Sequence, residues 1–161
     1  MLAYSVGLFD EASLLAERAI QLGPNSALAL SQAGSALFHC NRAAKAVSVL
    51  EHAVRLDPID PASHHTLSMM AYALLSQEND VRALAIAQQA VSRKPNYAFG
   101  WRGLIAAQAL SGRVGEARDS LATMLRVEPQ FSITALRART PSADTMFRRV
   151  IEGLRMAGAP E

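Results

Sequence analysis

Two short segments that contain histidine are the places where this sequence could perform chemistry. In the first, His39 is followed directly by Cys40, and a thiol close to an imidazole base is the pairing that cysteine nucleophiles use. Neighbouring residues on a helix point about 100° apart, however, so these two side chains are poorly placed to share a proton. We therefore interpret Cys40 as a packed side chain and His39 as a residue facing a groove.

The second segment, His64-His65, follows Asp57 and Asp60. Asp60 and His64 have the i, i+4 spacing at which two ligands can meet a metal on one helix face. Aspartate is also favoured at the start of a helix, here a helix that would begin at Pro61. We favour the helix cap and expect no metal and no cofactor, which leaves a cryptic hydrolase or metal site at these histidines as a remote alternative.

Other classes of function lack their signatures. The sequence contains neither GxGxxG nor GxxxxGK[ST], and no pair of carboxylates suggests an acid and a base. Its 16 basic and 14 acidic residues leave a net charge of +2 without a run of five like charges, so nucleic-acid binding is not indicated. No stretch of about 18 apolar residues predicts a membrane span, and the first residues do not resemble a signal peptide. We expect a cytoplasmic, non-enzymatic protein.

Prolines recur along the chain at a nearly constant interval. The interval from Pro24 to Pro58 equals that from Pro95 to Pro129, and the one between them is three positions longer. Small or apolar residues stand twelve, eight and five positions before each proline. Apolar residues three and four apart form the stripe of an amphipathic helix, so each proline follows a helix. A second helical stretch precedes this helix in three of the segments: Leu28 to Cys40, Ala62 to Gln77 and Ala98 to Leu110.

These segments resemble the tetratricopeptide repeat (TPR). The unit that matches best contains Trp101, Leu104, Gly112, Ala117, Leu121 and Pro129. The resemblance implies an all-α fold, an α-α superhelix of about four helical hairpins with the first one truncated and a C-terminal capping helix. The expected units are residues 1–26, 27–60, 61–97 and 98–131, followed by a capping segment over 132–161. In the third unit we expect a first helix lengthened by about one turn, with Leu67 aligned with Ala33 and Leu104.

The resemblance also implies a groove, lined by the first helix of each unit, that binds a protein or peptide. The residues at the inner positions of the TPR family are Ser31, Gln32, Ser35, Phe38, His39, His65, Thr66, Met69, Tyr72 and Arg102. Only Arg102 among them is basic, so a clamp for a terminal carboxylate is not expected. A partner segment could lie on Phe38, Met69 and Tyr72. Alternatively, these apolar side chains contact the terminal helix.

The beginning of the chain departs from the repeat. The first unit lacks the opening of its first helix, which would expose an apolar edge near Leu14 and Leu15. We expect the chain to be the C-terminal part of a longer protein, and a stand-alone adaptor that dimerises through this edge is the alternative.

The end of the chain also leaves the repeat phase. We expect a short helix near Ile133 to Arg137, a break at Thr140-Pro141 and a last helix from about Asp144 to Met156, which Gly158 ends. The side chains expected to dock are those of Met146, Phe147, Val150, Ile151 and Leu154. Those expected to face water are Arg148, Arg149, Glu152 and Arg155.

The amino-acid sequence of this tail carries a second resemblance. Leu136 to Arg139 and Gly153 to Gly158 are similar to the C-terminal TPR regions of bacterial class III adenylate/guanylate cyclases and of winged-helix TPR regulators. This resemblance implies a regulatory or interaction region of a bacterial signalling protein, with a catalytic or DNA-binding domain upstream. That upstream domain would itself be a candidate occupant of the groove.

Overall fold

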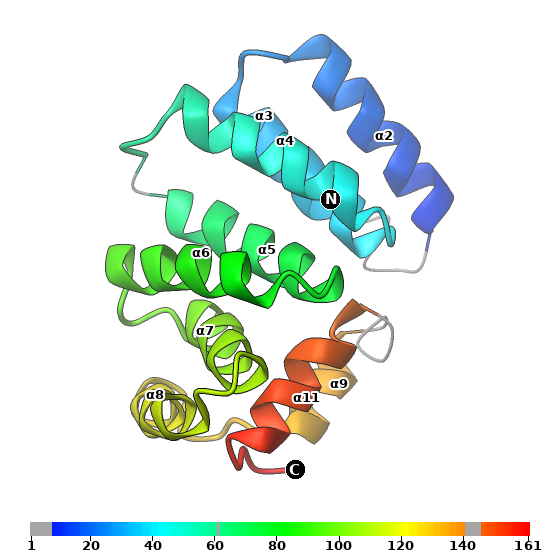
Figure 1. The fold of residues 1–161 in the computed structure, drawn as a ribbon. Coiled ribbons are helices and arrows are strands. Elements are labelled where there is room, and N and C mark those ends of the chain that lie inside the picture. The colour runs from blue at the N-terminus through cyan, green and yellow to red at the C-terminus, as the bar shows by residue number, and fades with distance from the viewer. Residues whose placement is uncertain (1–7, 61, 141–145) are drawn as a thin grey trace.

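The computed structural model describes residues 8–60, 62–140 and 146–161, and these residues form helices joined by short loops (Figure 1). The helices are α2 (Phe9–Leu22), α3 (Ala27–His39), α4 (Ala43–Leu56), α5 (Ser63–Ser76), α6 (Asp80–Arg93), α7 (Ala98–Leu110), α8 (Val114–Val127), α9 (Ile133–Arg139) and α11 (Arg148–Met156). Within the described ranges there is no strand. The predicted all-α solenoid is confirmed, although the opening of the first unit falls on residues 1–7, outside the described part.

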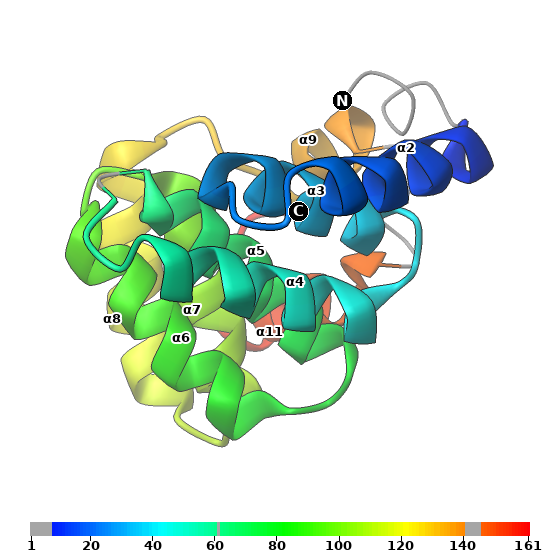
Figure 2. The same ribbon diagram turned by 90° about the horizontal axis from the view of Figure 1, so that it is seen from above.

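The helix before each proline has a constant length and position. α2, α4, α6 and α8 each contain 14 residues and end two positions before the proline. Twelve positions before the proline, each carries an alanine that is at most 4% exposed: Ala12, Ala46, Ala83 and Ala117. An alanine there lets the neighbouring helix approach closely, so these helices stack in regular order beside α3, α5 and α7 (Figure 2).

Each hairpin turns through one left-handed residue at the same place in the repeat. Asn41 (φ 59°), Glu78 (φ 60°) and Gly112 (φ 80°) all stand at the same distance before the proline of their unit. The next amide donates to the carbonyl five positions back, as in a Schellman motif. These bonds are Arg42 to Leu37 (2.9 Å), Asn79 to Leu74 (3.1 Å) and Arg113 to Gln108 (2.8 Å). The shared turn fixes the register of the three first helices.

This register corrects the prediction for the third unit. Met70, rather than Leu67, aligns with Ala33 and Leu104, because Leu74 takes the place of Leu37 in the turn. α5 has 14 residues against 13 in α3 and α7, so the helix is not lengthened by a turn. Most of the additional residues lie in the loop before α5.

The loop before α5 is organised by Asp60. Its carboxylate accepts a hydrogen bond from the Ala62 amide at 2.8 Å, and its carbonyl accepts one from the Ser63 hydroxyl at 2.6 Å. Asp60 therefore caps this turn as a structural residue, although the helix begins at Ser63 rather than at Pro61, which is outside the described residues.

The last helix, α11, packs across α5 and α7 (Figure 1). The five side chains expected to dock are all at most 4% exposed. Gly153 lies so close to α7 that a Cβ atom there would be 2.5 Å from the Ala106 Cα. α11 begins at Arg148, with Phe147 as its N-cap, so the helix starts later than the expected start near Asp144, a residue that itself lies outside the described part.

One prediction for this helix is wrong. Arg149 does not face water, because its guanidinium donates to the Asp80 carboxylate at 2.5 and 2.7 Å and to the Leu75 carbonyl at 3.1 Å. Arg149 thus ties α11 to the end of α5 and the start of α6.

Candidate functional site

The inner face is the side of the solenoid that α3, α5 and α7 form and on which α11 packs. Because the three helices share one register, side chains at equal distances from the following proline fall into rows. One row, in the first turn of each helix, contains Leu28, His65 and Phe99. Another row, two turns further along, contains Ser35, Tyr72 and Ala106. These rows have different surroundings.

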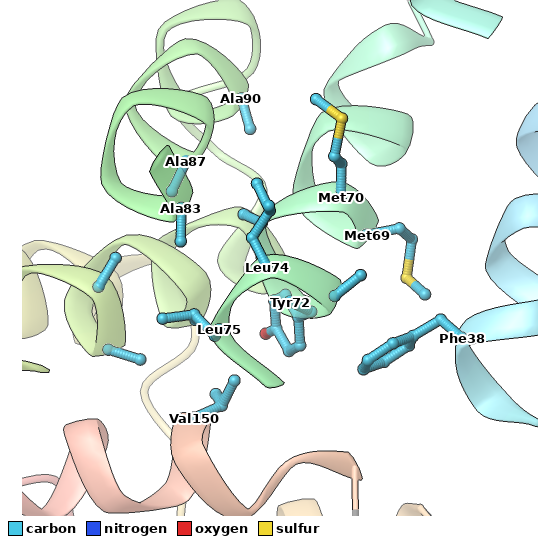
Figure 3. Packing of buried hydrophobic residues seen from close by; sticks show 14 of the residues in the cluster. Phe38, Met69, Met70, Tyr72, Leu74, Leu75, Ala83, Ala87, Ala90 and Val150 are labelled. Atoms are coloured by element: carbon cyan, nitrogen blue, oxygen red, sulfur yellow. The ribbon is translucent and has the colours of Figure 1, made fainter. Parts of the chain in front are cut away.

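The rows nearer the hairpin turns are covered by the chain itself. The Phe147 ring, at the start of α11, lies 5.6 Å from the Phe38 ring and 5.2 Å from the Tyr72 ring, between centroids. Phe38, Met69 and Tyr72 are each 1% exposed, and Val150 of α11 lies near Leu75 and Tyr72 (Figure 3). Phe38 and Tyr72 of the predicted groove therefore contact the C-terminal segment through Phe147, which is the alternative that the sequence left open.

Tyr72 connects the covered part of the inner face to the part beyond it. Its ring stacks on Phe99 at 4.5 Å between centroids with an interplanar angle of 5°, and its hydroxyl donates to the Phe99 carbonyl at 3.1 Å. A Cβ at position 103 would be 3.0 Å from the Tyr72 ring, so Gly103 leaves the space that this ring occupies. Burial raises the pKa of the Tyr72 hydroxyl, so the hydroxyl stays protonated and acts as a hydrogen-bond donor.

His39 and Cys40 do not form a reactive pair. Burial, followed by the charge of His65, lowers the pKa of His39 to about 4, so its imidazole is neutral at pH 7. Burial also raises the pKa of the Cys40 thiol, which donates to the Phe9 carbonyl at 3.2 Å. A nucleophilic cysteine needs a lowered pKa, so this environment does not favour a thiolate.

The histidines do not gather with other ligands around a point. Among the residues that the structure describes, no group of three or more His, Cys, Asp or Glu side chains is placed to hold a metal ion. His64 instead contacts the ring of Tyr97, just before α7, and His65 contacts the ring of Phe99 in α7.

The polar residues of the predicted groove mostly bind one another. The hydroxyls of Ser31 and Thr66 are hydrogen-bonded at 2.7 Å and join α3 to α5. Ser35 donates to the Ser31 carbonyl at 2.9 Å. Gln32 differs, because its buried Oε1 atom accepts no hydrogen bond from any group in the described part of the chain.

Arg102 is the basic residue of the predicted groove, and its charge is largely neutralised. It is 9% exposed, its guanidinium is paired with the Glu128 carboxylate, and it lies 5.1 Å above the centroid of the Phe131 ring. This cation–π contact and the ion pair hold the side chain between α7 and the loop after α8. Because the Glu128 carboxylate offsets its charge, Arg102 adds little net positive charge to the inner face.

The row farthest from the hairpin turns is open. We call Leu28, His64, His65, Tyr97 and Phe99 the open patch. Leu28 is 71% exposed, and the other four are half-buried. Because this patch lies on the first turns of α3, α5 and α7 and just before α7, it is separate from the contacts of Phe147.

Contacts among the rings hold the open patch in place. His65 Nδ1 and the Tyr97 hydroxyl are hydrogen-bonded at 3.0 Å, the His65 ring stacks on Phe99 at 6.0 Å, and the His64 ring meets Tyr97 edge-on at 4.8 Å. Burial lowers the pKa of His65, with a smaller contribution from His64, and burial raises the pKa of Tyr97. The patch is therefore aromatic with polar atoms at its edge, and both pKa shifts favour the neutral forms of His65 and Tyr97.

Of the five residues in the open patch, only His65 is among the groove residues predicted from the sequence. Leu28, His64, Tyr97 and Phe99 were missed because they are not among the inner positions that the TPR resemblance implies. The signal that could have found Leu28 and Phe99 is their position in the repeat, which is the same as that of His65.

No protein-family profile matches this chain. Solved structures with a similar fold include that of PilW, described as a widely conserved type IV pilus biogenesis factor, with a TM-score of 0.73 and 16% identity over 96% of this chain and 73% of that one. MamA from Desulfovibrio magneticus RS-1 has a TM-score of 0.69 and 18% identity over 98% of this chain and 92% of that one.

A third similar structure is that of YrrB, described as a TPR protein with an unusual peptide-binding site. It has a TM-score of 0.65 and 21% identity, and the match covers 97% of this chain and 79% of that one. In the described residues, no helix is long and apolar enough to cross a membrane. Together, the repeat geometry and these likenesses show that the chain has the TPR solenoid fold.

Proposed function

We propose that this protein is a non-catalytic protein–protein interaction scaffold, which binds a peptide segment of its partner on the open patch. The observation that carries this proposal is the division of the inner face: α11 fills one part, whereas in the other part Leu28 is 71% exposed and the rings of His65 and Phe99 are half-buried. Aromatic side chains with apolar bodies and polar edges are enriched where proteins bind one another. The peptide-binding site named for YrrB supports this use of the fold.

The predicted groove residues have two roles in this proposal. His65, which lies in the open patch, contacts the partner directly. Phe38 and Tyr72 instead pack against Phe147 at the start of α11, and Tyr72 also stacks on Phe99 of the patch.

Site-specific photo-crosslinking tests the proposal. A photoreactive benzoylphenylalanine replaces Leu28 in one variant and Val81 in a control. Val81 is a good control because it is 81% exposed but lies on α6, at a position that is exposed in every repeat. We expect one partner peptide, identified by mass spectrometry, to be crosslinked from position 28 and not from the control position. Equal crosslinking from both positions, or none from position 28, would contradict the proposal.

A more specific role rests on the tail. The similarity of Leu136–Arg139 and Gly153–Gly158 to cyclase-associated and winged-helix TPR regions supports a place in a bacterial signalling protein, in which residues 1–131 are the solenoid and 132–161 the cap. The partner would then include the protein's own upstream domain. An immunoblot of the source cells tests this role. We expect a band well above 17.3 kDa, and a band at 17.3 kDa would contradict it.

Self-association through α2 is a second candidate function. Leu15 is 51% exposed, whereas Ser120 and Val49, which hold the same position in α8 and α4, are each 8% exposed. An apolar residue that is uncovered only in the first unit favours an edge that pairs with a second copy. Light scattering should then show a mass that rises with concentration and falls in Leu15→Glu. A monomer at every concentration would exclude this candidate.

A further inference from the structure

The hydrogen-bonded pair of His65 and Tyr97 has one more proton than its own bond uses. His65 Nδ1 and the Tyr97 hydroxyl oxygen are 3.0 Å apart. Burial lowers the pKa of His65, which favours the neutral imidazole with a single N–H group. The pair then has one N–H and one O–H group, and the bond between the two side chains uses one of them. The other proton, on His65 Nε2 or on the Tyr97 oxygen according to the tautomer, has no acceptor among the described residues.

Other hydrogen-bond donors lie beside this pair. Helix α7 has no side-chain cap at its N-cap residue, Tyr97. Two later amides of its first turn donate to the Tyr97 carbonyl, which leaves the amides of Ala98 and Phe99 as donors. The Lys94 ammonium, 5.9 Å from the centroid of the Tyr97 ring, is a donor as well. This side of the open patch is therefore rich in donors.

The acceptors around the open patch, in contrast, are already in use. The Asp60 carboxylate, before α5, accepts from the Ala62 amide at 2.8 Å. Backbone carbonyls near the rings accept hydrogen bonds from within the chain: that of His64 from the Ser68 hydroxyl (2.7 Å), that of Pro95 from the Trp101 indole (2.7 Å), that of Tyr97 from the Gly100 amide (3.0 Å) and that of Phe99 from the Tyr72 hydroxyl (3.1 Å). The open patch thus offers a partner more donors than acceptors.

The rings of the open patch add an apolar surface that is held in place. The Tyr97 and Phe99 rings are 5.8 Å apart between centroids, at an interplanar angle of 50°. Phe99 also stacks on Tyr72, which is 1% exposed, so its ring rests on the buried core. Leu28, at the same position in α3, is 71% exposed. A partner therefore meets fixed aromatic faces and an exposed aliphatic side chain next to unused donors.

From this excess of donors we infer that the open patch binds a proline-rich segment of the partner in the polyproline II (PPII) conformation. This inference rests on the proposed function and names the kind of segment that the patch binds. Proline has no N–H group, so such a segment presents carbonyl acceptors and leaves few donors without a partner. A PPII helix has no internal hydrogen bonds, so its carbonyls are available to the protein that binds it.

Each part of the patch has a role in this complex. A carbonyl of the segment accepts the unused proton of the His65–Tyr97 pair, and proline rings lie on the Tyr97 and Phe99 rings. Surfaces lined by aromatic side chains bind proline-rich segments in this way. Leu28 contacts an apolar side chain of the segment. A segment of acidic residues would also supply acceptors, but it would leave the aromatic faces and Leu28 without apolar contacts.

Fluorescence anisotropy with the full chain and labelled peptides tests this inference. One peptide repeats Pro-Pro-Leu, a second has alanine in place of every proline, and a third has glutamate in place of every proline. We expect the proline peptide to bind about tenfold more tightly than either of the others, because only this peptide combines unpaired acceptors, apolar rings and a preformed PPII helix.

Variants of the His65–Tyr97 pair test the role of its unused proton. His65→Phe/Tyr97→Phe keeps two aromatic rings but removes both protons, and it should weaken binding of the proline peptide about tenfold. Each single variant still has one donor, so it should weaken binding about twofold or less. The control is His52→Phe, the same change at a half-buried residue of α4 outside the open patch, which should leave the affinity unchanged.

Two results would overturn the inference: equal binding of the three peptides, or single variants whose effects multiply to that of the double variant. Photo-crosslinking from position 28 separates this failure from a failure of the proposed function. A crosslinked partner peptide without proline would overturn the inference and leave the scaffold proposal intact. The absence of any crosslinked peptide would contradict both.

Discussion

The two parts of the inner face are built from the same three helices, but one part is buried and the other is exposed. Near the hairpin turns, Phe38 and Tyr72 are 1% exposed, because Phe147 packs against both. At the other ends of the helices, Leu28 is 71% exposed, and His65 and Phe99 are half-buried. The difference shows that a repeat can present equivalent positions, yet the segment after the repeats decides which of them remain available to a partner.

Removal of the Phe147 ring should have the largest effect on this division. Phe147→Ala takes away a side chain that is 2% exposed and contacts Phe38, His39 and Tyr72. We expect a loss of about 3 kcal/mol in the free energy of unfolding, measured in urea, because the ring leaves a cavity. Met156→Ala, on the same helix at a residue that is 42% exposed, should change it by about 0.5 kcal/mol or less. Equal effects would show that α11 does not cover the inner face.

The contact of α11 with α7 can be broken by a single methyl group. Gly153→Ala would place a Cβ 2.5 Å from the Cα and 2.8 Å from the carbonyl oxygen of Ala106, and the backbone of α7 cannot easily move away. We expect a net loss of about 1–2 kcal/mol, since the strain exceeds the gain in helix propensity. Gly115→Ala in α8 is the matched control, because its Cβ meets nothing within 4 Å. It should raise the melting temperature, and a similar rise in Gly153→Ala would refute the close contact.

A fall in pH should weaken the covered part through His39. Its pKa in the folded state is about 4, below the unfolded value of 6.5, so the unfolded chain binds more protons between these values. The stability contributed by neutral His39 is complete above pH 6.5 and is lost as the pH falls toward 4. The loss should be on the order of 2 kcal/mol in urea unfolding. His39→Gln should lack that part of the pH dependence, and an unchanged dependence in this variant would contradict the assignment.

Changes in the open patch should have the smallest effect on stability. Leu28→Glu alters a side chain that is 71% exposed, so the free energy of unfolding should change by about 0.5 kcal/mol or less. Met69→Glu, a change of the same kind in the covered part, should be strongly destabilising because it buries an unpaired charge. Thermal melts of the two variants compare the regions directly. A large loss in Leu28→Glu would mean that this end of the inner face is also packed.

Much of the fold could be predicted because the repeat marks its own boundaries. The prolines located the second helices, and the spacing of Met146, Phe147, Val150, Ile151 and Leu154 identified the docking face of α11. The register of α5 was missed because the left-handed residue of its turn is Glu78, whereas Asn41 and Gly112 mark the other two turns. Glutamate carries no such conformational signal.

Less of the site could be predicted, because its contacts join distant parts of the chain. Arg149 and Asp80 are 69 residues apart, and no local pattern relates them. The path of α11 across α5 and α7 depends on the close approach of Gly153 to Ala106. In this sequence, two small residues on helices do not by themselves indicate that the two helices meet. Only the structure shows that this path ends short of His65 and Phe99 and leaves them open.

Hydroxyl-radical footprinting of the folded chain tests the division of the inner face most directly. Oxidation depends on exposure, so Met156, at 42% exposed, provides an internal reference for Met69, at 1%. We predict that Met69, Phe38 and Tyr72 are protected, whereas Leu28, His65, Tyr97 and Phe99 are modified. Modification of Tyr72 at the rate of Tyr97 would contradict the account, because Phe147 would then not cover this part of the inner face.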